Sequence, residues 1–352
     1  MLFGRRKTPL LGIDISSTSV KLLEFGRNGR HYCVEGYGIE PLPPNVGMER
    51  DLIDVQQVGD AIARAVKKSG TRVRQAACAV SGSAVITKVI SMPNNLSEDD
   101  LETQIRFEAD QYIPYPLEEV NLDFETLGPS ETDPDKVDVL LAASRSDNID
   151  VRVAALEAGG LIAKIIDVEA FALEKGVAFM IREGGDRDRA DTIAVVDIGA
   201  TSTSLNVLKD LKIIYTREQM FGGRQLTEEI QRRYSLSYEE ATAAKHQGRL
   251  PENYVPEVLE PFKQTMALEV SRALQFFYAS RQISTVDRIL LAGGCASIPG
   301  ISELVETATG INTKIADPFA NLDLSSRVRP EGLKNDAPAM LIACGLALRE
   351  FD

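Results

Sequence analysis

Two aspartates in this chain each follow an apolar run and precede a stretch of small, mostly hydroxylated residues. Asp14 follows residues 11–13, and Asp197 follows residues 195–196. A buried strand that ends in aspartate and continues into such a turn places backbone N–H groups and hydroxyls around a phosphate tail, while the carboxylate holds Mg²⁺ directly or through water. We therefore expect Asp14 and Asp197 to flank a metal ion. The residues expected to line the phosphates are Ser16, Ser17, Thr18, Ser19, Gly199, Ala200, Thr201 and Ser202.

These two motifs are copies of one pattern. They lie 183 residues apart in a chain of 352 residues, and each continues with a second strand, a turn and a third strand. A single copy would be weak evidence for a phosphate site, because Asp-Ile-Gly after a strand is often only a turn. Two copies at half-chain spacing instead predict two related α/β halves whose loops face each other across a cleft. The strands expected after the aspartates cover residues 20–25 and 31–39, and residues 204–208 and 211–217.

A third motif joins an apolar strand to a glycine turn. Residues 288–292 form the strand, and Gly293 and Gly294 follow it. Paired glycines let a backbone approach a flat ring or a ribose closely. A simple turn between a strand and a helix would use the same residues, so this motif alone leaves both interpretations open.

Composition excludes several classes of function. Hydrophobic residues make up 44% of the chain and charged residues 26%, and no run of 18 apolar residues is present, which predicts a globular protein that does not cross a membrane. The net charge of −13 argues against nucleic acid as the main ligand, because phosphate backbones need clustered Lys and Arg. Four cysteines without C-x-x-C spacing and two histidines give no pattern for disulfides or zinc. The basic segment 1–7 lacks the apolar stretch of a signal peptide, so a cytoplasmic location is expected; this segment is either a weak lipid tether or a solvated terminus.

The patterns between the motifs divide the chain. Apolar spacing and capping residues predict three helices. The first covers 55–69 and is stopped by Gly70, the second covers 97–109 with Ser97 as its N-cap, and the third covers 148–158. Strands are expected at 76–92, 121–126 and 137–144, and a helix at 339–349. The expected domains are a first half at 1–86 and 164–190, an inserted α+β module at 87–163, and a second half at 191–352 with a helical subdomain at about 223–285.

The motifs, with segments 166–173 and 343–349 as two connecting helices, resemble the actin-like ATPase superfamily in order and spacing. The resemblance implies an α/β, ribonuclease H-like fold of two halves. The module before the first connecting helix looks like the inserted subdomain of the cell-division protein FtsA. Segments 13–21, 81–88, 108–120 and 138–145 are similar to the PilM family of type IV pilus assembly proteins, and this likeness extends over essentially the whole chain.

The resemblance implies ATP and Mg²⁺ as cofactors and assigns further residues. Lys21 stands where relatives have a phosphate-contacting lysine, with an exposed strand lysine as the alternative. Lys245 borders the base and ribose, or is a solvated surface lysine. Glu169 lies where relatives direct a polar side chain at the attacking water, or is a structural glutamate. Ser16 replaces a glycine of many relatives, which puts hydrolysis in doubt more than binding. The other nucleotide contacts implied are Gly223, Arg224, Thr227, Gly293, Gly294 and Ala296.

The function implied is an ATP-binding cytoplasmic scaffold, at most a slow ATPase, in the inner-membrane assembly complex of the type IV pilus. It would couple nucleotide state to pilus assembly and twitching motility. Its partners would be the N-terminal cytoplasmic peptide of a PilN-like bitopic membrane protein and other pilus components, including cytoplasmic motor ATPases. The alternatives are a filament-forming ATPase like FtsA or MreB and a small-molecule kinase of the same superfold; homo-oligomerisation is left open. Acidic residues at 350 and 352 predict that membrane attachment comes from the partner.

The segment expected to grip the partner peptide is stiff and partly aromatic. Its prolines brace the backbone, and aromatic side chains on a stiff backbone offer much contact area at a small entropic cost. Adjacent strands at 79–90 and 137–143 are expected to offer an edge to which an extended peptide adds. Packing of the segment onto its own module is the alternative. The residues of this segment are Tyr112, Ile113, Pro114, Tyr115 and Pro116.

Overall fold

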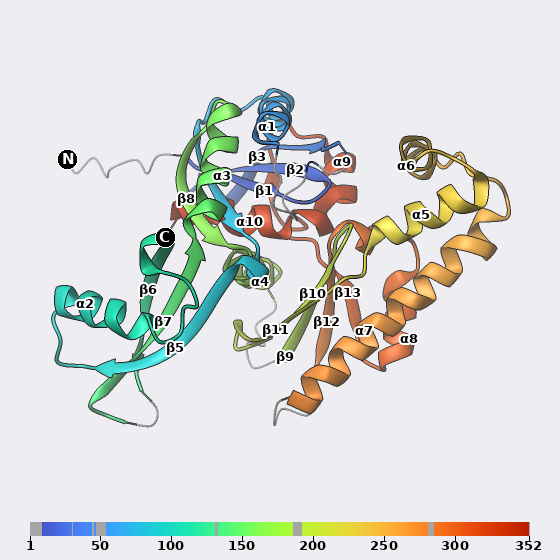
Figure 1. The fold of residues 1–352 in the computed structure, drawn as a ribbon. Helices are drawn as coiled ribbons and strands as arrows, with labels where there is room; N and C mark the ends of the chain where they lie inside the picture. Colours follow the sequence, from blue (N-terminus) through green and yellow to red (C-terminus); the bar gives the residue numbers. More distant parts are fainter. Residues whose placement is uncertain are drawn as a thin grey trace.

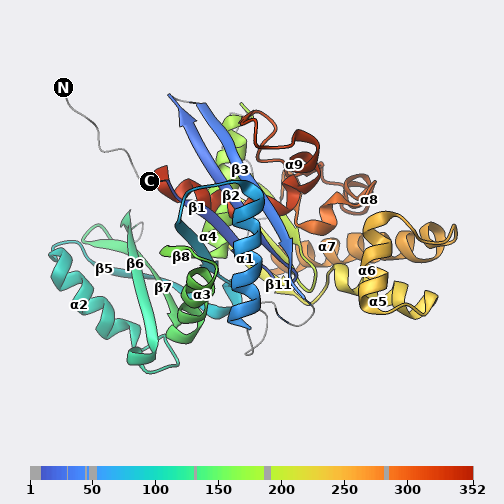
Figure 2. The same cartoon turned by 90° about the horizontal axis from the view of Figure 1, so that it is seen from above.

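The computed structural model describes residues 9–29, 31–43, 46, 54–130, 133–185, 192–280 and 285–351, so the basic segment 1–7 lies outside the described residues. Two large sheets stand next to each other, and a smaller sheet projects to one side (Figure 1). Seen from above, this smaller module and the helices α5 to α7 lie at opposite ends of the molecule (Figure 2). Within the described ranges, no helix is long and apolar enough to span a membrane.

The two large sheets are copies of one arrangement, which confirms the repeat predicted from the aspartate motifs. In each, a central strand pairs antiparallel with the strand that follows it and parallel with a later one. The first sheet has the order β14 (Asp323–Leu324), β3 (His31–Pro41), β2 (Ser19–Asn28), β1 (Leu11–Ile15), β4 (Gln75–Val80) and β8 (Ile162–Val168). The second has the order β11 (Lys212–Gln219), β10 (Thr203–Lys209), β9 (Thr192–Ile198), β12 (Arg288–Ala292) and β13 (Thr313–Ile315).

Helix α1 (Val55–Ser69) begins and ends at the residues predicted from the sequence. The Asp54 side chain accepts a hydrogen bond from the N–H of Gln57, and Gly70 ends the helix in the left-handed conformation with φ 67°. Val58 and Ile62 lie on the buried face, where they join the apolar core under the first sheet. Helix α3 (Ser146–Ala158) packs beside α1 and adds Leu156 to the same core.

Two helices connect the halves and cross at glycines. They are α4 (Glu169–Glu183) and α10 (Leu341–Ala347). A Cβ atom on Gly345 would collide with the backbone oxygen of Ala172, and one on Gly176 would lie 2.5 Å from the backbone oxygen of Leu341. The helix expected at 166–173 begins only at Glu169, because residues 166–168 pair with β4 as the end of β8.

The inserted module is a three-stranded antiparallel sheet with one helix. Its strands lie in the order β5 (Val85–Pro93), β7 (Lys136–Arg145) and β6 (Val120–Pro129). Helix α2 (Glu98–Ala109) packs on this sheet, and its residue Ile105 is part of the module's core. Ser97 caps α2 as predicted, because its side chain accepts from the N–H of Asp100. The strand expected at 76–92 is in fact two strands in two sheets, β4 and β5, with a break at 81–84. Strand β7 is central, so the expectation of an edge at 137–143 was wrong; β5 and β6 are the edges.

Packing favours different domain limits from those expected. Helix α3 belongs to the core of the first half, so we propose Val85–Arg145 for the module rather than 87–163. The segment after β13 also returns to the first half, where β14 pairs with β3 and Phe319 and Leu333 pack against Phe25 and Val34. We therefore propose about 192–315 for the second half rather than 191–352.

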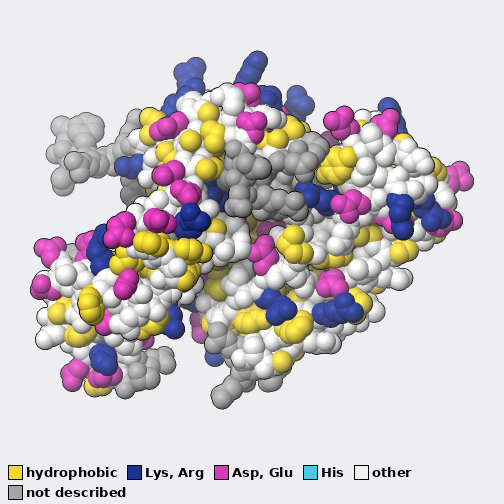
Figure 3. Space-filling view, viewed as in Figure 1, with side chains coloured by type: hydrophobic (Ala, Val, Ile, Leu, Met, Phe, Trp, Pro, Cys, Tyr) yellow, Lys and Arg dark blue, Asp and Glu magenta, His cyan; other side chains and the backbone are white. Residues whose placement is uncertain are grey.

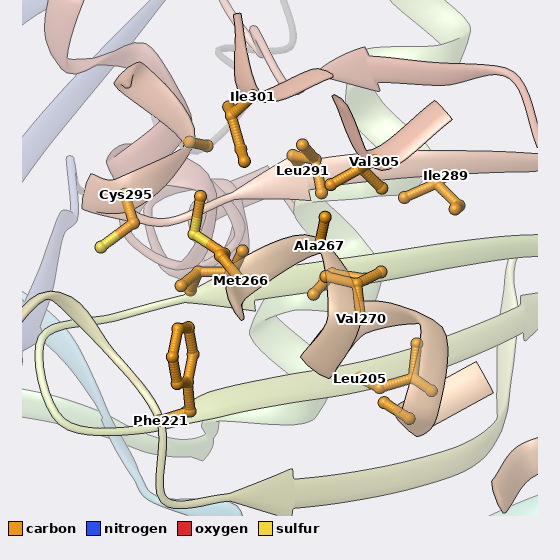
Figure 4. Close-up of a cluster of buried hydrophobic side chains, with 14 of the residues drawn as sticks. Leu205, Phe221, Met266, Ala267, Val270, Ile289, Leu291, Cys295, Ile301 and Val305 are labelled. Atoms are coloured by element: carbon orange, nitrogen blue, oxygen red, sulfur yellow. The ribbon is translucent and has the colours of Figure 1, made fainter. Parts of the chain in front are cut away.

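The second half keeps its helices on one face of its sheet. They are α5 (Gly223–Tyr234), α6 (Tyr238–Gln247), α7 (Glu260–Ser280) and α8 (Ile301–Thr309), with α9 (Pro330–Asp336) following in the segment that returns to the first half. In the core, Met266 and Val270 of α7 lie between Leu205 of β10 and Leu291 of β12 (Figure 4). Gly248 ends α6 with φ 64°, and Pro256 lies in a π-helical turn, Val255–Leu259, that leads directly into α7.

Candidate functional site

The two hydroxyl-rich loops form the same turn and touch each other. The N–H of Ser16 donates to the oxygen of Ser19 at 2.9 Å, and the N–H of Gly199 donates to the oxygen of Ser202 at 2.9 Å. The Thr201 hydroxyl lies 3.4 Å from that of Ser17. Two turns that are half a chain apart in sequence therefore face each other, as the repeat predicts, and their N–H groups and hydroxyls border one common space.

Asp14 is the next-to-last residue of β1 and forms an ion pair across the sheet with Lys21. These residues are opposite each other in the β1–β2 register, and the Lys21 Nζ lies 2.6 Å from the Asp14 Oδ2. The side chains are only 14% and 4% exposed. Burial is the largest influence on Lys21 and opposes its charge, but the attraction and hydrogen bond of Asp14, with the charges of Asp197 and Glu169, together outweigh it, so the pKa of Lys21 is raised. Lys21 is therefore not a solvated strand lysine.

Two more acidic groups, both half-buried, lie near this pair. Burial raises the pKa of Asp197 to about 6, although Lys21 opposes that shift. Burial, with repulsion from Asp14, raises the pKa of Glu169 to about 8. Glu169 is the first residue of α4, so the connecting helix begins at the cluster. A cation placed between the carboxylates would lower both pKa values, since it stabilises the ionised forms.

The donor set suits Mg²⁺. Asp14 and Asp197 offer carboxylate oxygens, and the loops offer hydroxyls, which are the hard oxygen ligands that Mg²⁺ prefers. Asp197 is half-buried, and the charge of Lys21 lowers its pKa less than desolvation raises it, so a second cation would stabilise its ionised form. In the described residues, no group of three His, Cys, Asp or Glu could by itself hold a metal. A metal here would take its remaining ligands from phosphate and water.

The glycine turn after β12 lies against the second loop. Gly293 has φ 84°, and a Cβ atom on it would sit 2.5 Å from the Asp197 Oδ1, so only glycine fits. A Cβ on Gly294 would meet nothing within 4 Å, which leaves this residue facing open space. The side chain of Ala296 is fully buried in the second-half core, so only its backbone is left for a ligand.

The start of α5 is tied to the second loop. The N–H of Gly223 donates to the oxygen of Gly199 at 3.0 Å, and the N–H of Arg224 donates to the oxygen of Ala200 at 2.7 Å. These two N–H groups therefore hold the loop in place, and because they already donate to it they are not available to a phosphate. Thr227 is buried and accepts a hydrogen bond from the Lys245 Nζ at 2.8 Å. Burial lowers the pKa of Lys245, so it is not a solvated surface lysine.

Sequence patterns did not indicate two residues beside this site. The thiol of Cys295 donates to the oxygen of Gly199 at 3.4 Å, and burial raises its pKa to about 11, which makes it a structural group. Arg152 is buried on α3 and its charge acts on Glu169. Cys295 lies between Gly294 and Ala296 of the glycine motif, but its residue type gave no signal. Arg152 stands in no motif, and only the fold brings it to the site.

A pocket of about 100 Å³ lies where the module joins the first half. Ile113 and Tyr115 line it, but Tyr112 does not. Ile113 is also buried in the core of its own module, whereas Tyr115 is 42% exposed and lies under the guanidinium of Arg145, 5.7 Å from its ring centroid. In Figure 3, hydrophobic side chains gather on the module near this junction, with Lys and Arg beside them. Of the predicted segment, Ile113 and Tyr115 therefore line the pocket, and Ile113 also packs in the core of the module. The pocket is lined by Ser83, Ala84, Val85, Ile86, Ile113, Tyr115, Val120, Ala143, Ser144, Arg145 and Asn148.

Comparisons with known proteins agree with this architecture. Residues 12–351 match the family described as type IV pilus assembly protein PilM. The solved PilM–PilN type IV pilus biogenesis complex is similar over 98% of this chain and 99% of that chain, with 29% identity and a TM-score of 0.79. The ethanolamine utilization protein EutJ from Carboxydothermus hydrogenoformans, at 16% identity, covers 96% and 88% with a TM-score of 0.55. An archaeal actin homologue, Ta0583, at 11% identity, covers 97% and 98% with a TM-score of 0.50. The last two show the actin-like fold alone, which confirms the fold class.

Proposed function

The chain belongs to the PilM family of type IV pilus assembly proteins, and from that premise we propose that it is an ATP-binding scaffold that holds the N-terminal cytoplasmic peptide of a PilN-like inner-membrane protein. In this role it works at the cytoplasmic face of the inner membrane and is recruited there by the membrane protein. Cytoplasmic motor ATPases of the pilus are further partners under this proposal.

The pocket at the junction carries the peptide part of the proposal. Its volume of about 100 Å³ suits one aliphatic side chain rather than a cofactor. Tyr115 and Arg145 stand at its rim, so an apolar anchor would be flanked by an aromatic surface and a cation. Strand β5 is an edge and contributes Val85 and Ile86 to the lining, which lets an extended peptide pair with its main chain while one side chain enters the pocket.

The paired loops carry the nucleotide part. When bound, Mg²⁺ would neutralise phosphate charge; Asp14 and Asp197 would hold it from opposite sheets, and Lys21 would contact a phosphate oxygen. The N–H groups and hydroxyls of both loops would surround the phosphates. Gly293 and Gly294 would let the adenosine lie close to the backbone. Binding by both halves favours the closed arrangement, because each half supplies one loop.

Hydrolysis is expected to be slow, because the candidate for activating water is poorly suited to it. Without a cation the pKa of Glu169 is about 8, so at neutral pH this residue can accept a proton from water only when a bound metal lowers that pKa. Ser16 also ties its hydroxyl to the oxygen of Ser19 at 3.0 Å, which stiffens the first loop. Positioning by the loops supports binding, while the chemical step depends on a base whose ionisation requires the bound metal.

A titration tests the proposal directly. A synthetic peptide with the N-terminal cytoplasmic sequence of a PilN protein from the same genome is titrated into the full chain in a calorimeter, and a scrambled peptide is the control. We expect saturable binding of the first peptide only. No binding, or equal binding of both peptides, would remove the proposal.

A further inference from the structure

The chain crosses between the module and the first half twice, and hydrogen bonds tie the two crossings together. It enters through residues 81–84, after β4, and returns at the junction of β7 and α3. The Ser144 hydroxyl donates to the oxygen of Ala84 at 2.9 Å, and the Asn148 side chain donates to the Ser144 hydroxyl at 3.4 Å. All three residues line the junction pocket. A ligand in the pocket therefore contacts both crossings.

Arg152 binds the same two crossings from inside the protein. It lies one turn along α3 from Asn148 and is only 4% exposed. Its Nη1 donates to the backbone oxygen of Asn148 at 2.7 Å, and its Nε donates to the backbone oxygen of Ala79 at 2.7 Å. Ala79 lies on β4, two residues before the first crossing begins at Ser81. One guanidinium thus joins the end of β4 to the start of α3.

The far side of Arg152 acts on the nucleotide site. Ala79 pairs with Asp167 of β8, and Glu169 follows two residues later as the first residue of α4. The positive charge of Arg152 lowers the pKa of Glu169 against the effect of burial, and Glu169 in turn stabilises the charge of Arg152. Hydrogen bonds therefore run from the pocket through Asn148 to Arg152, and from there the charge of Arg152 acts on the carboxyl group of Glu169, near Asp14 and Asp197.

Arg152 is a costly group to bury for structural reasons alone. Within the described residues it has no ion pair within 4.0 Å, and its two hydrogen bonds go to backbone oxygens. A buried charge without a close counter-ion destabilises a protein compared with a well-packed apolar side chain of similar size. The residue is therefore better explained by what its charge does at Glu169 than by stability.

We propose that Arg152 is a positioning residue that couples the peptide pocket to the nucleotide site, so that peptide and ATP–Mg²⁺ bind cooperatively. This inference rests on the proposed function. A peptide in the pocket holds the two crossings together, which fixes Arg152 and, through it, Glu169. The nucleotide site is then already ordered, so the protein loses less conformational freedom when ATP–Mg²⁺ binds. The cooperativity is therefore positive. By linkage, ATP–Mg²⁺ must tighten peptide binding by the same factor.

The test measures ATP–Mg²⁺ affinity by calorimetry with and without saturating PilN-like peptide. The unsubstituted protein should bind ATP–Mg²⁺ at least about 5-fold more tightly when the peptide is present. In Arg152→Gln this ratio should fall to about one, although each ligand alone still binds. Arg152→Lys should keep part of the ratio, because it retains the charge. The matched control is Arg145→Gln, which should weaken peptide binding but leave the ratio unchanged, since Arg145 lines the pocket outside the chain of hydrogen bonds.

The outcomes separate the two proposals. If the unsubstituted protein binds no peptide, the proposed function fails and this inference fails with it. If it binds both ligands without cooperativity, or if Arg152→Gln keeps the full ratio, only the inference is overturned. Should Arg152→Gln not fold, Ser144→Ala replaces it, because it removes the hydrogen bond to Ala84 at the pocket wall. Ser144→Ala should reduce the ratio, and an unchanged ratio in that folded variant would also overturn the inference.

Discussion

The hydroxyls of Ser17 and Thr201 lie 3.4 Å apart, although 184 residues separate them in the sequence. Ser17 belongs to the loop of the first half, and Thr201 to the loop of the second. The contact shows that the two turns meet directly when the halves are close. A phosphate group between them would replace this hydroxyl contact with hydrogen bonds to itself, so ligand binding and the distance between the halves are linked.

We predict that Asp197→Ala abolishes detectable ATP–Mg²⁺ binding. The substitution removes one of the two carboxylates that would hold the metal from opposite sheets, and a Mg²⁺ site that loses a charged ligand loses most of its affinity. Isothermal calorimetry of the folded variant is the measurement. Asp99→Ala, on the exposed face of α2, is the control and should bind as the unsubstituted protein does. Equal ATP–Mg²⁺ affinity in the Asp197 variant would contradict the site.

Turnover of bound ATP should be far slower than in phosphoryl-transfer enzymes, whose rate constants are typically about 1–100 s⁻¹. The physical reasons are the stiffened first loop and a candidate base, Glu169, whose ionisation depends on the bound metal. Phosphate release from a saturated complex, followed for hours, measures this rate. A rate constant above about 1 s⁻¹ would show that another group activates water.

Stability without ligand should fall as the pH rises from about 5 to about 8. The pKa of Glu169 is raised in the folded protein from its ordinary value of 4.5 to about 8, so folding favours the protonated form. This stabilisation is complete below pH 4.5 and is lost as the pH passes through the folded value. The measurement is the thermal midpoint across this range, in buffer without Mg²⁺. In Glu169→Gln, which is always neutral, the decline should be smaller; an identical decline would show that other groups cause it.

Tyr115→Ala should weaken binding of a PilN-like peptide about 10-fold, because Tyr115 lines the junction pocket and offers a large aromatic surface. Tyr112→Ala is a matched control in the same turn. Its ring lies under Lys88 outside the pocket, so its effect should be much smaller. Fluorescence anisotropy of a labelled peptide measures both affinities. A larger loss in the Tyr112 variant would place the peptide on the other side of the turn.

The crossing of the connecting helices makes Gly345→Ala strongly destabilising. The new methyl group would collide with the backbone oxygen of Ala172, so α4 and α10 would have to separate. Overpacking usually costs about 1–3 kcal/mol, and a clash with rigid backbone should reach at least the upper end. Chemical denaturation measures the loss. Gly82→Ala is the control, because a Cβ atom there meets nothing within 4 Å, and it should change stability little.

Local signals allowed much of this structure to be predicted. The limits of α1 follow from its own capping residues, Asp54 and Gly70. The two strands that carry the aspartates follow from the internal repeat, which is visible in the sequence itself. The break between β4 and β5 lies at residues 81–84, where Ser, Gly and Ala interrupt the β-branched run, but the change from one sheet to another at this point has no local signal. The same holds for β14 and Arg152. Their places depend on packing between segments far apart in the sequence, which leaves no local pattern.

The return of residues 317–351 to the first half bears on how the protein is made. Residues 192–315 form a continuous unit with a core of its own on one face of the second sheet, and the other face packs mainly against the earlier helix α4, with Leu341 as a later contact. Strand β1, by contrast, is covered by α10, which the ribosome makes more than 300 residues later. At about 5–20 residues per second, the first sheet waits for on the order of tens of seconds with an apolar surface uncovered. The second half is therefore expected to fold first during translation, and the N-terminal strands are the segment most in need of a chaperone.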